Sequence, residues 1–327
     1  MSSNVITEPA AGAPAAATPA SAPPLEQRIP YKKVELKGDH PTWCPGCGDY
    51  SVLDLYFRLC ERRQVPREKI VSVAGIGCSS RFPYFVRAHG AHFIHGRAVA
   101  FATGLSLSRP DLHVFAFSGD GDAFSIGGNH LEHAARKNIH MTLVIMDNSV
   151  YGLTKKQTSP TSPIGFKTKT DPTGAIDQPV NPIKKLLTAG ATFIARTTHT
   201  NPQHVLQMME RAMDHKGFSV IECLSECVEF YPGAFDAANP RKGGQFRLIE
   251  EKKHDGSPED AKRHDPTDEI AAFKLASEPF PGWFGVFFQV PRPTKNEKEQ
   301  KLIEAMRAAA KNAPPLTLLK NTFARLK

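Results

Sequence analysis

The sequence from Ser118 to Gln157, SGDGDAFSIGGNHLEHAARKNIHMTLVIMDNSVYGLTKKQ, follows one apolar segment and contains another. Residues 112–117 lead into Gly119-Asp120-Gly121-Asp122, and residues 141–146 lead into Asp147-Asn148. A helix-compatible segment separates the two. This alternation predicts two parallel strands of an α/β sheet whose carboxyl ends lie at one edge, where such sheets bind their ligands.

The residues at that edge are suited to a metal ion and a diphosphate. Asp120 offers a carboxylate and Asn148 an amide oxygen, and both are hard ligands of the kind that Mg²⁺ takes together with phosphate oxygens. Gly119 and Gly121 let the backbone approach a diphosphate closely. The stretch therefore predicts a magnesium–diphosphate site, although Gly-Asp-Gly alone also forms simple tight turns.

Gly-Asp-Gly followed at this distance by Asn148 resembles the signature of thiamine diphosphate enzymes. The run from Asn148 to Lys155, with Gln157-Thr158-Ser159-Pro160-Thr161 after it, resembles the β subunit of 2-oxoacid:ferredoxin oxidoreductases. That family usually has two Asn where this chain has Asp147-Asn148. The resemblance implies that thiamine diphosphate is bound by His95, Gly119, Asp120, Gly121, Asp122, Asn148, Val150, Gly152 and Leu153. It also implies that Mg²⁺ is held by Asp120, Asn148 and the backbone of Val150.

A third segment, around His95, also points to phosphate. His95-Gly96-Arg97-Ala98 precedes a helix rich in small residues, and an imidazole beside a helix N-terminus is a sensible phosphate partner. The resembling family has this His against the diphosphate. His89 and His92 are expected to be ordinary surface or loop residues. A metal site formed by the three His is an alternative, but it lacks nearby Asp or Glu partners.

The six cysteines are expected to be ligands or core residues, because disulfide frameworks are rare in a cytosolic chain of this size. Cys44 and Cys47 form a Cys-Pro-Gly-Cys turn. This turn is compatible with a redox dithiol, half a zinc site or half an iron–sulfur site. Cys78 lies in a glycine-containing loop after a predicted strand, and Cys227 follows another.

Four thiolates, the number that a [4Fe–4S] cluster needs, would come from Cys44, Cys47, Cys78 and Cys227. Their wide, uneven spacing favours a cluster held between loops over a zinc ribbon, which requires two Cys-x-x-Cys pairs. The same family matches at Cys-Pro-Gly-Cys-Gly, at Gly-Ile-Gly-Cys-Ser-Ser and at Cys227, which implies one [4Fe–4S] cluster per chain. Cys223 is the rival fourth ligand. Its place inside an apolar strand favours the core, and helical spacing favours the core for Cys60.

The rest of the pattern predicts an α/β fold with a doubly wound, mostly parallel sheet. Asp49 is interpreted as an N-cap. Further strands are expected at 70–74, 192–195 and 218–224, and helices at 50–63, 182–189 and 201–215.

Three parts are expected along the chain. Residues 1–27 form an Ala/Pro-rich disordered leader, residues 28–232 bind thiamine diphosphate and the cluster, and residues 233–327 form an irregular C-terminal extension that contacts another subunit. In this extension, residues 282–291 are interpreted as an edge strand or a segment packed on a partner. Residues 295–311 are interpreted as an amphipathic helix.

Composition and charge narrow the expected partners. The 327 residues include 41 Lys and Arg against 33 Asp and Glu, and the positive charge is spread along the chain. No nucleic-acid-binding motif accompanies it, so no nucleic acid partner is expected. A basic face for an acidic electron carrier or for anionic substrates explains the charge. No apolar run approaches the roughly 20 residues of a membrane span, and no signal sequence is recognisable, so a cytoplasmic protein without a membrane partner is expected.

The family resemblance implies a reaction class and a partner. It implies a β subunit that oxidatively decarboxylates a 2-oxo acid, with coenzyme A as co-substrate, and that passes electrons through the cluster to ferredoxin. We find no second α/β domain to complete the thiamine site. An α subunit that supplies the pyrimidine and coenzyme A contacts is therefore expected, in an αβ or α₂β₂ assembly.

Two cations flank the predicted site and bear on the substrate. Arg81 lies three residues after Cys78, and Lys155 lies seven after Asn148. Two cations favour a dicarboxylate, and therefore conversion of 2-oxoglutarate to succinyl-CoA, with pyruvate and branched-chain 2-oxo acids as alternatives. A non-catalytic metal–cysteine binding protein would leave Gly-Asp-Gly and Asn148 unexplained. A non-redox thiamine diphosphate decarboxylase would make the four cysteines coincidental.

Overall fold

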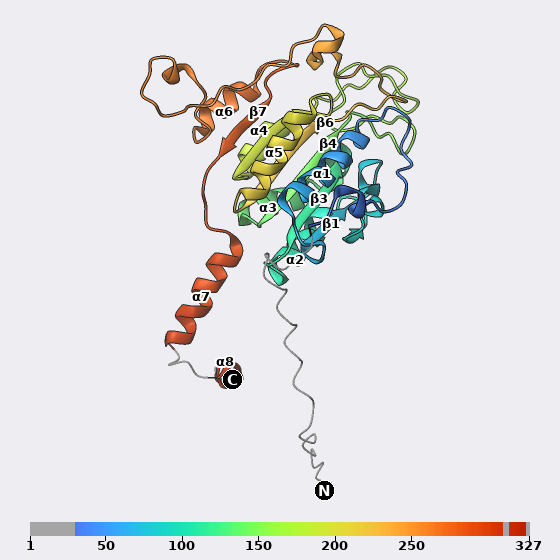
Figure 1. The fold of residues 1–327 in the computed structure, drawn as a ribbon. Helices are drawn as coiled ribbons and strands as arrows, with labels where there is room; N and C mark the ends of the chain where they lie inside the picture. Colours follow the sequence, from blue (N-terminus) through green and yellow to red (C-terminus); the bar gives the residue numbers. More distant parts are fainter. Residues whose placement is uncertain (1–29, 310–313, 325–327) are drawn as a thin grey trace. The chain divides into compact units, whose positions relative to one another are not determined.

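The computed structural model describes residues 30–309 and 314–324 (Figure 1). The leader predicted at 1–27 and the last two residues of the helix predicted at 295–311 lie outside the described residues. Within the described ranges, every helix is too short or too polar to cross a bilayer.

A seven-stranded sheet with the order β2-β1-β3-β4-β6-β5-β7 forms the centre of the fold. Every neighbouring pair is parallel except β5 and β7, which confirms the predicted mostly parallel sheet. The strands are β1 (Ile70–Ala74), β2 (His89–His92), β3 (His113–Gly119), β4 (Met141–Asp147), β5 (Phe193–Thr198), β6 (Phe218–Leu224) and β7 (Gly285–Gln289).

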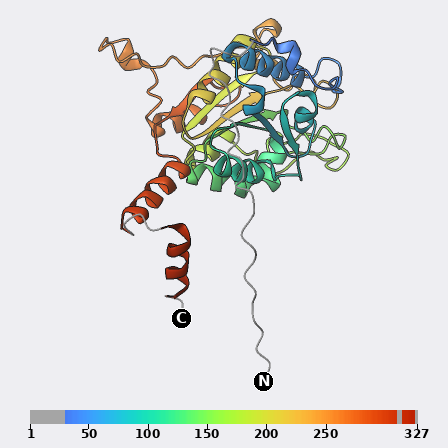
Figure 2. The ribbon, with the colours of Figure 1, turned by 60° about the horizontal axis from the view of Figure 1, so that its bottom comes forward.

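Helices cover both faces of the sheet, as a doubly wound fold requires. On one face α1 packs against α5, and on the other α2, α3, α4 and α6 pack in a row. Figure 2 shows α1 (blue) and the green helices α2 and α3 on opposite sides of the strands. The helices are α1 (Asp49–Arg63), α2 (Ala98–Ser108), α3 (Gly128–Lys137), α4 (Pro182–Ala189), α5 (Pro202–Asp214), α6 (Glu269–Ala276), α7 (Lys295–Ala309) and α8 (Pro315–Ala324).

The central strands form because they are apolar along their whole length. Every residue of β1, β4 and β6 is buried. Such continuous apolar runs are typical of parallel strands that are covered on both faces. Register then aligns their ends: Ala74 pairs with Phe117, Gly119 with Met146, and Asp147 with Leu224. The loops after β1, β3, β4 and β6 therefore start side by side.

One local prediction was wrong. Asp49 is not an N-cap, because Gly48 takes that position and the Asp49 carboxylate accepts a hydrogen bond from Ser225 Oγ at 2.6 Å. His89 and His92, expected as surface or loop residues, bound the edge strand β2, which pairs with β1, and His89 is exposed there. The sequence of β2, His-Gly-Ala-His, has no β-branched residue, so only pairing with its neighbour makes it a strand.

Part of the C-terminal region belongs to the sheet. Strand β7 runs antiparallel along β5 at the sheet edge, which confirms the edge-strand interpretation of residues 282–291. Helix α6 was not predicted, because it lies in a polar segment and buries only Ala272 and Ala276. These two small residues pack into the main core beside Phe287.

Two buried histidines make the fold acid-sensitive. His204 on α5 and His215 just after it are neutral, because burial lowers the pKa of each to about 4. Their unfolded pKa is about 6.5, so as pH falls from 6.5 towards 4 the unfolded chain binds protons that the folded chain does not. Stability is therefore complete above pH 6.5 and is lost below it.

We expect the melting temperature to fall between pH 6.5 and 4, and His204→Gln to reduce that slope. Scanning fluorimetry of both proteins across this range measures it. His133→Gln, at an exposed position of α3, is the control and should leave the slope unchanged. Identical slopes for His204→Gln and the unmodified protein would contradict the assignment.

Candidate active site

Four adjacent strands bring the predicted site residues to one edge of the sheet. Cys78 follows β1, Asp120 follows β3, Asn148 follows β4 and Cys227 follows β6, and these four strands are consecutive neighbours in the sheet. In Figure 1 the blue segment before α1, which carries Cys44 and Cys47, and the green loop after β4 lie on the same side of the molecule. The metal–diphosphate and cysteine motifs therefore share one edge.

Two buried carboxylates meet at this edge around one hydroxyl. Thr161 Oγ1 lies 2.8 Å from Asp120 Oδ2 and 2.9 Å from Asp147 Oδ1, and both Asp residues are 2% exposed. Burial raises the pKa of Asp120, and burial followed by the charge of Asp120 raises the pKa of Asp147. A hydroxyl donates to one carboxylate at a time, so this donor set fits a site that a divalent cation would stabilise.

The turn after β4 places further oxygen atoms at the edge. Asn148 is partly exposed, and its Oδ1 accepts a hydrogen bond from the backbone of Val150 at 3.2 Å. Ser149 has a left-handed backbone (φ 54°) and donates from both its N–H and its hydroxyl to Asp147 Oδ1. The chain thus turns sharply between Asn148 and Val150. In the part of the chain that is described, no three His, Cys, Asp or Glu side chains gather as ligands of one metal ion.

Asp122 orients His95. The Asp122 Oδ1 atom lies 2.8 Å from His95 Nδ1 and accepts from the backbone N–H groups of Gly96 at 2.6 Å and Ile76 at 3.1 Å. Its Oδ2 accepts from Ser118 Oγ at 2.5 Å. These bonds tie the loops after β1, β2 and β3 together and leave His95 Nε2 as the nitrogen that can meet a phosphate.

Tyr151 joins the Gly-Asp-Gly turn to the turn after β4. A Cβ on Gly121 would lie 2.1 Å from Tyr151 Cε1, so only glycine fits beneath this ring. The Tyr151 hydroxyl donates to the Gly121 carbonyl at 3.3 Å, and the Tyr151 ring meets the His95 ring edge-on at 6.3 Å. The two halves of the predicted diphosphate site are therefore packed against each other.

The loops that carry the cysteines are clamped by two long-range hydrogen bonds. Trp43 Nε1 donates to the Cys78 carbonyl at 2.7 Å, which ties the Cys-Pro-Gly-Cys turn to the loop after β1. Ser225 Oγ donates to Asp49 Oδ1 at 2.6 Å, which ties the start of α1 to the loop after β6. Residues within two positions of Cys44, Cys47 and Cys227 thus hold their loops together across the sheet edge.

Burial raises the pKa of Cys47, Cys78 and Cys227, and neighbouring cysteines add to the rise. The pKa of Cys47 is raised by burial, by Asp49, and by Cys78 and Cys227. Burial, Asp49, Cys227 and Cys44 raise the pKa of Cys78 to about 12, while Arg81 lowers it. Deprotonation of these neighbouring buried thiols is therefore unfavourable without a cation, and a cationic metal centre would offset that cost. The donor set therefore fits an iron–sulfur cluster.

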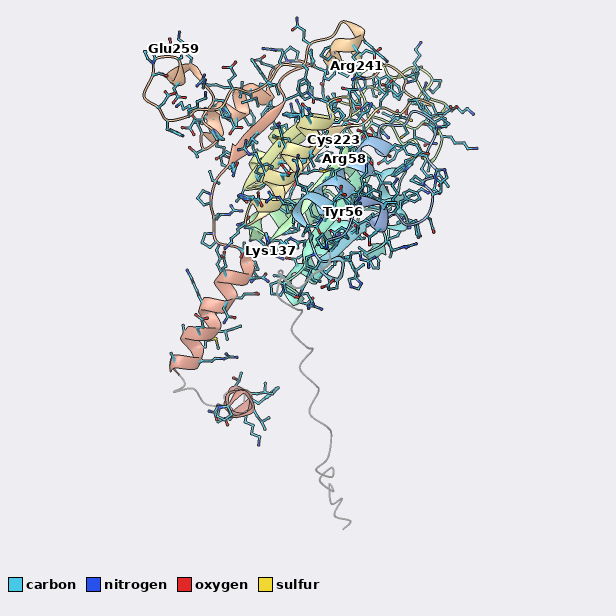
Figure 3. All side chains as sticks on the ribbon, viewed as in Figure 1. Tyr56, Arg58, Lys137, Cys223, Arg241 and Glu259 are labelled. Carbon is cyan, nitrogen blue, oxygen red and sulfur yellow. The ribbon has the colours of Figure 1, made fainter. Side chains whose placement is uncertain are left out.

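The other two cysteines lie in the core. Cys60 and Cys223 are buried, and Figure 3 shows Cys223 within the sheet on β6, paired with Met146 and Thr197 in the neighbouring strands. Cys227, in contrast, lies in the loop beyond the strand, where Cys227 Sγ and Cys78 Sγ both approach Gly152. This arrangement favours Cys227 over Cys223 as the fourth ligand.

Comparison with known proteins agrees with this geometry. Residues 75–223 match the model of the C-terminal thiamine pyrophosphate-binding domain of thiamine pyrophosphate enzymes. The chain is 38% identical to the 2-oxoglutarate oxidoreductase subunit KorB of Mycobacterium tuberculosis, over 86% of this chain and 84% of the relative. It is 34% identical to the 2-oxoglutarate synthase subunit KorB of Methanocaldococcus jannaschii, over 81% of this chain and 94% of that one. This chain belongs to the family of 2-oxoacid:ferredoxin oxidoreductase β subunits.

A solved structure supports the membership. A 2-oxoglutarate:ferredoxin oxidoreductase from Magnetococcus marinus, with 2-oxoglutarate, coenzyme A and succinyl-CoA bound, matches with a TM-score of 0.76 and 35% identity. The match covers 87% of this chain and 97% of that chain. The chain is thus an enzyme subunit with a thiamine diphosphate-binding domain, and the fold and family predicted from the sequence are confirmed.

The two predicted substrate-binding cations of this β subunit lie in different surroundings. Arg81 is partly buried, donates to the Thr42 carbonyl at 3.3 Å and lies 6.0 Å from the centre of the Phe85 ring, on the cysteine side of the site. Lys155 is exposed and has a left-handed backbone (φ 70°) in the turn after Gly152. A left-handed backbone is unfavourable for a lysine and is often found at functional sites.

Five residues of the site were not assigned from the sequence: Trp43, Asp49, Tyr151, Thr161 and Ser225. All five lie within or beside the motifs that identify the site, so the sequence indicates the part of the chain in which they lie. Their partners were not recognisable, because the Ser225–Asp49 bond, for example, joins residues 176 positions apart. Local patterns contain no signal for such contacts.

The Ser225–Asp49 bond should hold the cysteine loops in place. Ser225→Ala removes a donor to a buried carboxylate and should destabilise the protein by about 1.5–3 kcal/mol. In iron-free protein it should also speed the reaction of the cysteines with a thiol reagent, because the loops separate. Thermal melting and labelling rates measure the two effects.

Ser219→Ala is the matched control, since Ser219 is buried in β6, the strand that leads to Ser225, and donates to the Ala212 carbonyl at 2.9 Å. It should lower stability without changing the labelling rate. Equal labelling rates for the two variants would show that the bond does not organise the cysteines.

Proposed function

We propose that this subunit catalyses the coenzyme A-dependent oxidative decarboxylation of 2-oxoglutarate to succinyl-CoA, and that its electrons pass through one [4Fe–4S] cluster to ferredoxin. One observation carries the proposal: a carboxylate–amide edge and two cysteine-bearing loops follow neighbouring strands, and Trp43 ties the Cys-Pro-Gly-Cys turn to one of these loops. A diphosphate site alone would support many thiamine reactions. The adjacent thiol cluster supports those that release electrons one at a time.

The metal–diphosphate half is assigned to residues of the strand ends. Thiamine diphosphate, when bound, supplies the nucleophilic carbon needed to release CO₂ from a 2-oxo acid. Asp120, Asn148 and the backbone carbonyl of Val150 would hold its Mg²⁺. His95 would donate from Nε2 to the diphosphate, with Asp122 fixing the ring. The backbone at Gly119, Gly121, Gly152 and Leu153 would line the cofactor.

The cysteine half holds the electron acceptor. Cys44, Cys47, Cys78 and Cys227 would ligate the cluster, and the Trp43 and Ser225 bonds would keep their loops at the right separation. Cys44 is exposed, so ferredoxin would approach from the side of the Cys-Pro-Gly-Cys turn. The net charge of +8 favours an acidic partner for the chain as a whole.

A second subunit would complete the site. Apolar side chains next to His95 are exposed: Ile94 is 66% and Ile126 50% exposed, and Phe93 and Phe101 lie together with their ring centres 5.0 Å apart. Large apolar patches of this kind mark protein interfaces. We assign this surface to the α subunit, which would supply the pyrimidine and coenzyme A contacts in an αβ or α₂β₂ assembly.

The complex with its natural partner, purified without oxygen, should reduce a viologen dye with 2-oxoglutarate, thiamine diphosphate, Mg²⁺ and coenzyme A. Omitting coenzyme A should stop the reduction, and Cys78→Ser should abolish it. Reduction with pyruvate or branched-chain 2-oxo acids instead would support the proposed reaction class and contradict 2-oxoglutarate as the substrate. No reduction with any 2-oxo acid, from a complex with intact iron, would favour a non-catalytic metal–cysteine binding protein.

The exposed lysine gives a test of the substrate. If Lys155 and Arg81 hold the carboxylates of 2-oxoglutarate, Lys155→Met should raise KM for 2-oxoglutarate about tenfold, since a charge-assisted hydrogen bond contributes about 1.5–3 kcal/mol. Lys156→Met is the control, because Lys156 Nζ lies 5.3 Å from the centre of the Phe166 ring. Equal KM changes in the two variants would exclude Lys155 from substrate binding.

A further inference from the structure

Gly152 lies where the proposed magnesium turn meets the proposed cluster. A Cβ built on Gly152 would lie 3.5 Å from Cys227 Sγ, 3.6 Å from Cys78 Sγ and 3.9 Å from Asn148 Nδ2. The bare backbone of this residue therefore faces two thiols from opposite loops and an amide of the metal site at once.

Neither backbone conformation nor packing explains why a glycine is present. Gly152 is not one of the glycines with a left-handed backbone. The three separations around its missing side chain are ordinary van der Waals contacts. At Gly121 and Gly96, in contrast, a Cβ would lie only 2.1 Å and 2.4 Å from its neighbours. A methyl group at position 152 is thus compatible with the thiol form of the protein.

The space that a methyl group would fill is the space in front of two sulfurs. If Cys78 and Cys227 hold a cluster, its inorganic core must lie against their sulfur atoms, and a side chain at position 152 would compete with it. The loop has little freedom to retreat. Tyr151 N–H donates to the Gln157 carbonyl at 3.0 Å, Lys155 N–H donates to the Gly152 carbonyl at 2.9 Å, and the Tyr151 ring packs on Gly121.

We propose that Gly152 is a positioning residue that seats the cluster against the backbone of the magnesium turn, and so sets the short path from thiamine diphosphate to the cluster. This inference rests on the proposed function, because it requires the cluster to be present. Electron tunnelling slows steeply with distance, so direct contact between the two cofactor loops favours rapid transfer. A larger residue would separate the cluster from the turn or prevent its insertion.

The test is Gly152→Ala in the complex, purified without oxygen through a tag on this chain. Four properties are measured: iron and acid-labile sulfide per chain, the electron paramagnetic resonance spectrum and midpoint potential of the reduced cluster, thiamine diphosphate affinity with Mg²⁺, and melting temperature after iron removal. Gly128→Ala is the matched control. It adds the same methyl group in α3, 3.7 Å from Lys185 Nζ, where no cysteine contributes.

We expect Gly152→Ala to weaken retention of the cluster on the order of tenfold, the scale of changes around a metal centre, or to shift its spectrum and potential. The melting temperature of the iron-free protein should match that of the unmodified complex. Thiamine diphosphate affinity should fall by less than cluster retention, because the cofactor is lined by the backbone of Gly152 together with other residues, whereas the added methyl group faces the two sulfur atoms. Gly152→Val should enlarge the cluster effect, and Gly128→Ala should leave all four properties unchanged.

Three results would overturn the inference. The first is an unchanged cluster in both Gly152 variants, and the second is loss of thiamine diphosphate with an intact cluster. The third is equal loss of both cofactors, which would make Gly152 a general folding residue of the loop. Absence of iron from the unmodified complex would instead refute the proposed function, so the two failures are distinguishable.

Discussion

The site depends on one constraint, the alignment of parallel strand ends. Strands β1, β3, β4 and β6 are neighbours, and their register brings residues 74, 119 and 147 to one edge within a few positions of one another. Burial on both faces prevents any of these strands from slipping, because a shift of one residue would reverse which side chains face each helix layer. The irregular loops that follow these strands therefore start at fixed positions relative to one another.

The edge concentrates groups of like charge that are unfavourable without a counter-ion. Asp120 and Asp147 lie on either side of one hydroxyl. Burial, with smaller contributions from Asp49 and neighbouring cysteines, raises the pKa of Cys47 and Cys78. Such arrangements cost stability in a protein without ligands. Their presence in two adjacent places suits a chain whose native state contains two positively charged centres. The hydrogen bonds from Trp43 and Ser225 hold the cysteine loops in place.

The sequence predicts what is local and misses what is not. Strands 70–74 and 218–224 have the predicted bounds, because a short, mostly apolar run between turn residues has few alternatives. The edge strand β2 has no such run and was missed. Asp49 looked like a cap because it precedes an apolar helix, yet a serine far along the chain is its partner. The motifs predicted which edge of the sheet holds the site. Contacts between residues far apart in the sequence determine which side chains hold its loops in place.

Strand β7 has a consequence for where the catalytic unit ends. A chain that stopped at residue 232 would retain every residue proposed to bind a cofactor. It would also leave the N–H and C=O groups of β5 from Phe193 to Arg196 without the partners that β7 supplies. Leu224 would lose the apolar cluster that it forms with Phe235 and Phe284. An open apolar edge of this kind is a template for pairing with other chains. The C-terminal region therefore covers an edge strand that would otherwise favour aggregation. The shortest stable chain is longer than the shortest chain that contains every residue proposed to bind a cofactor.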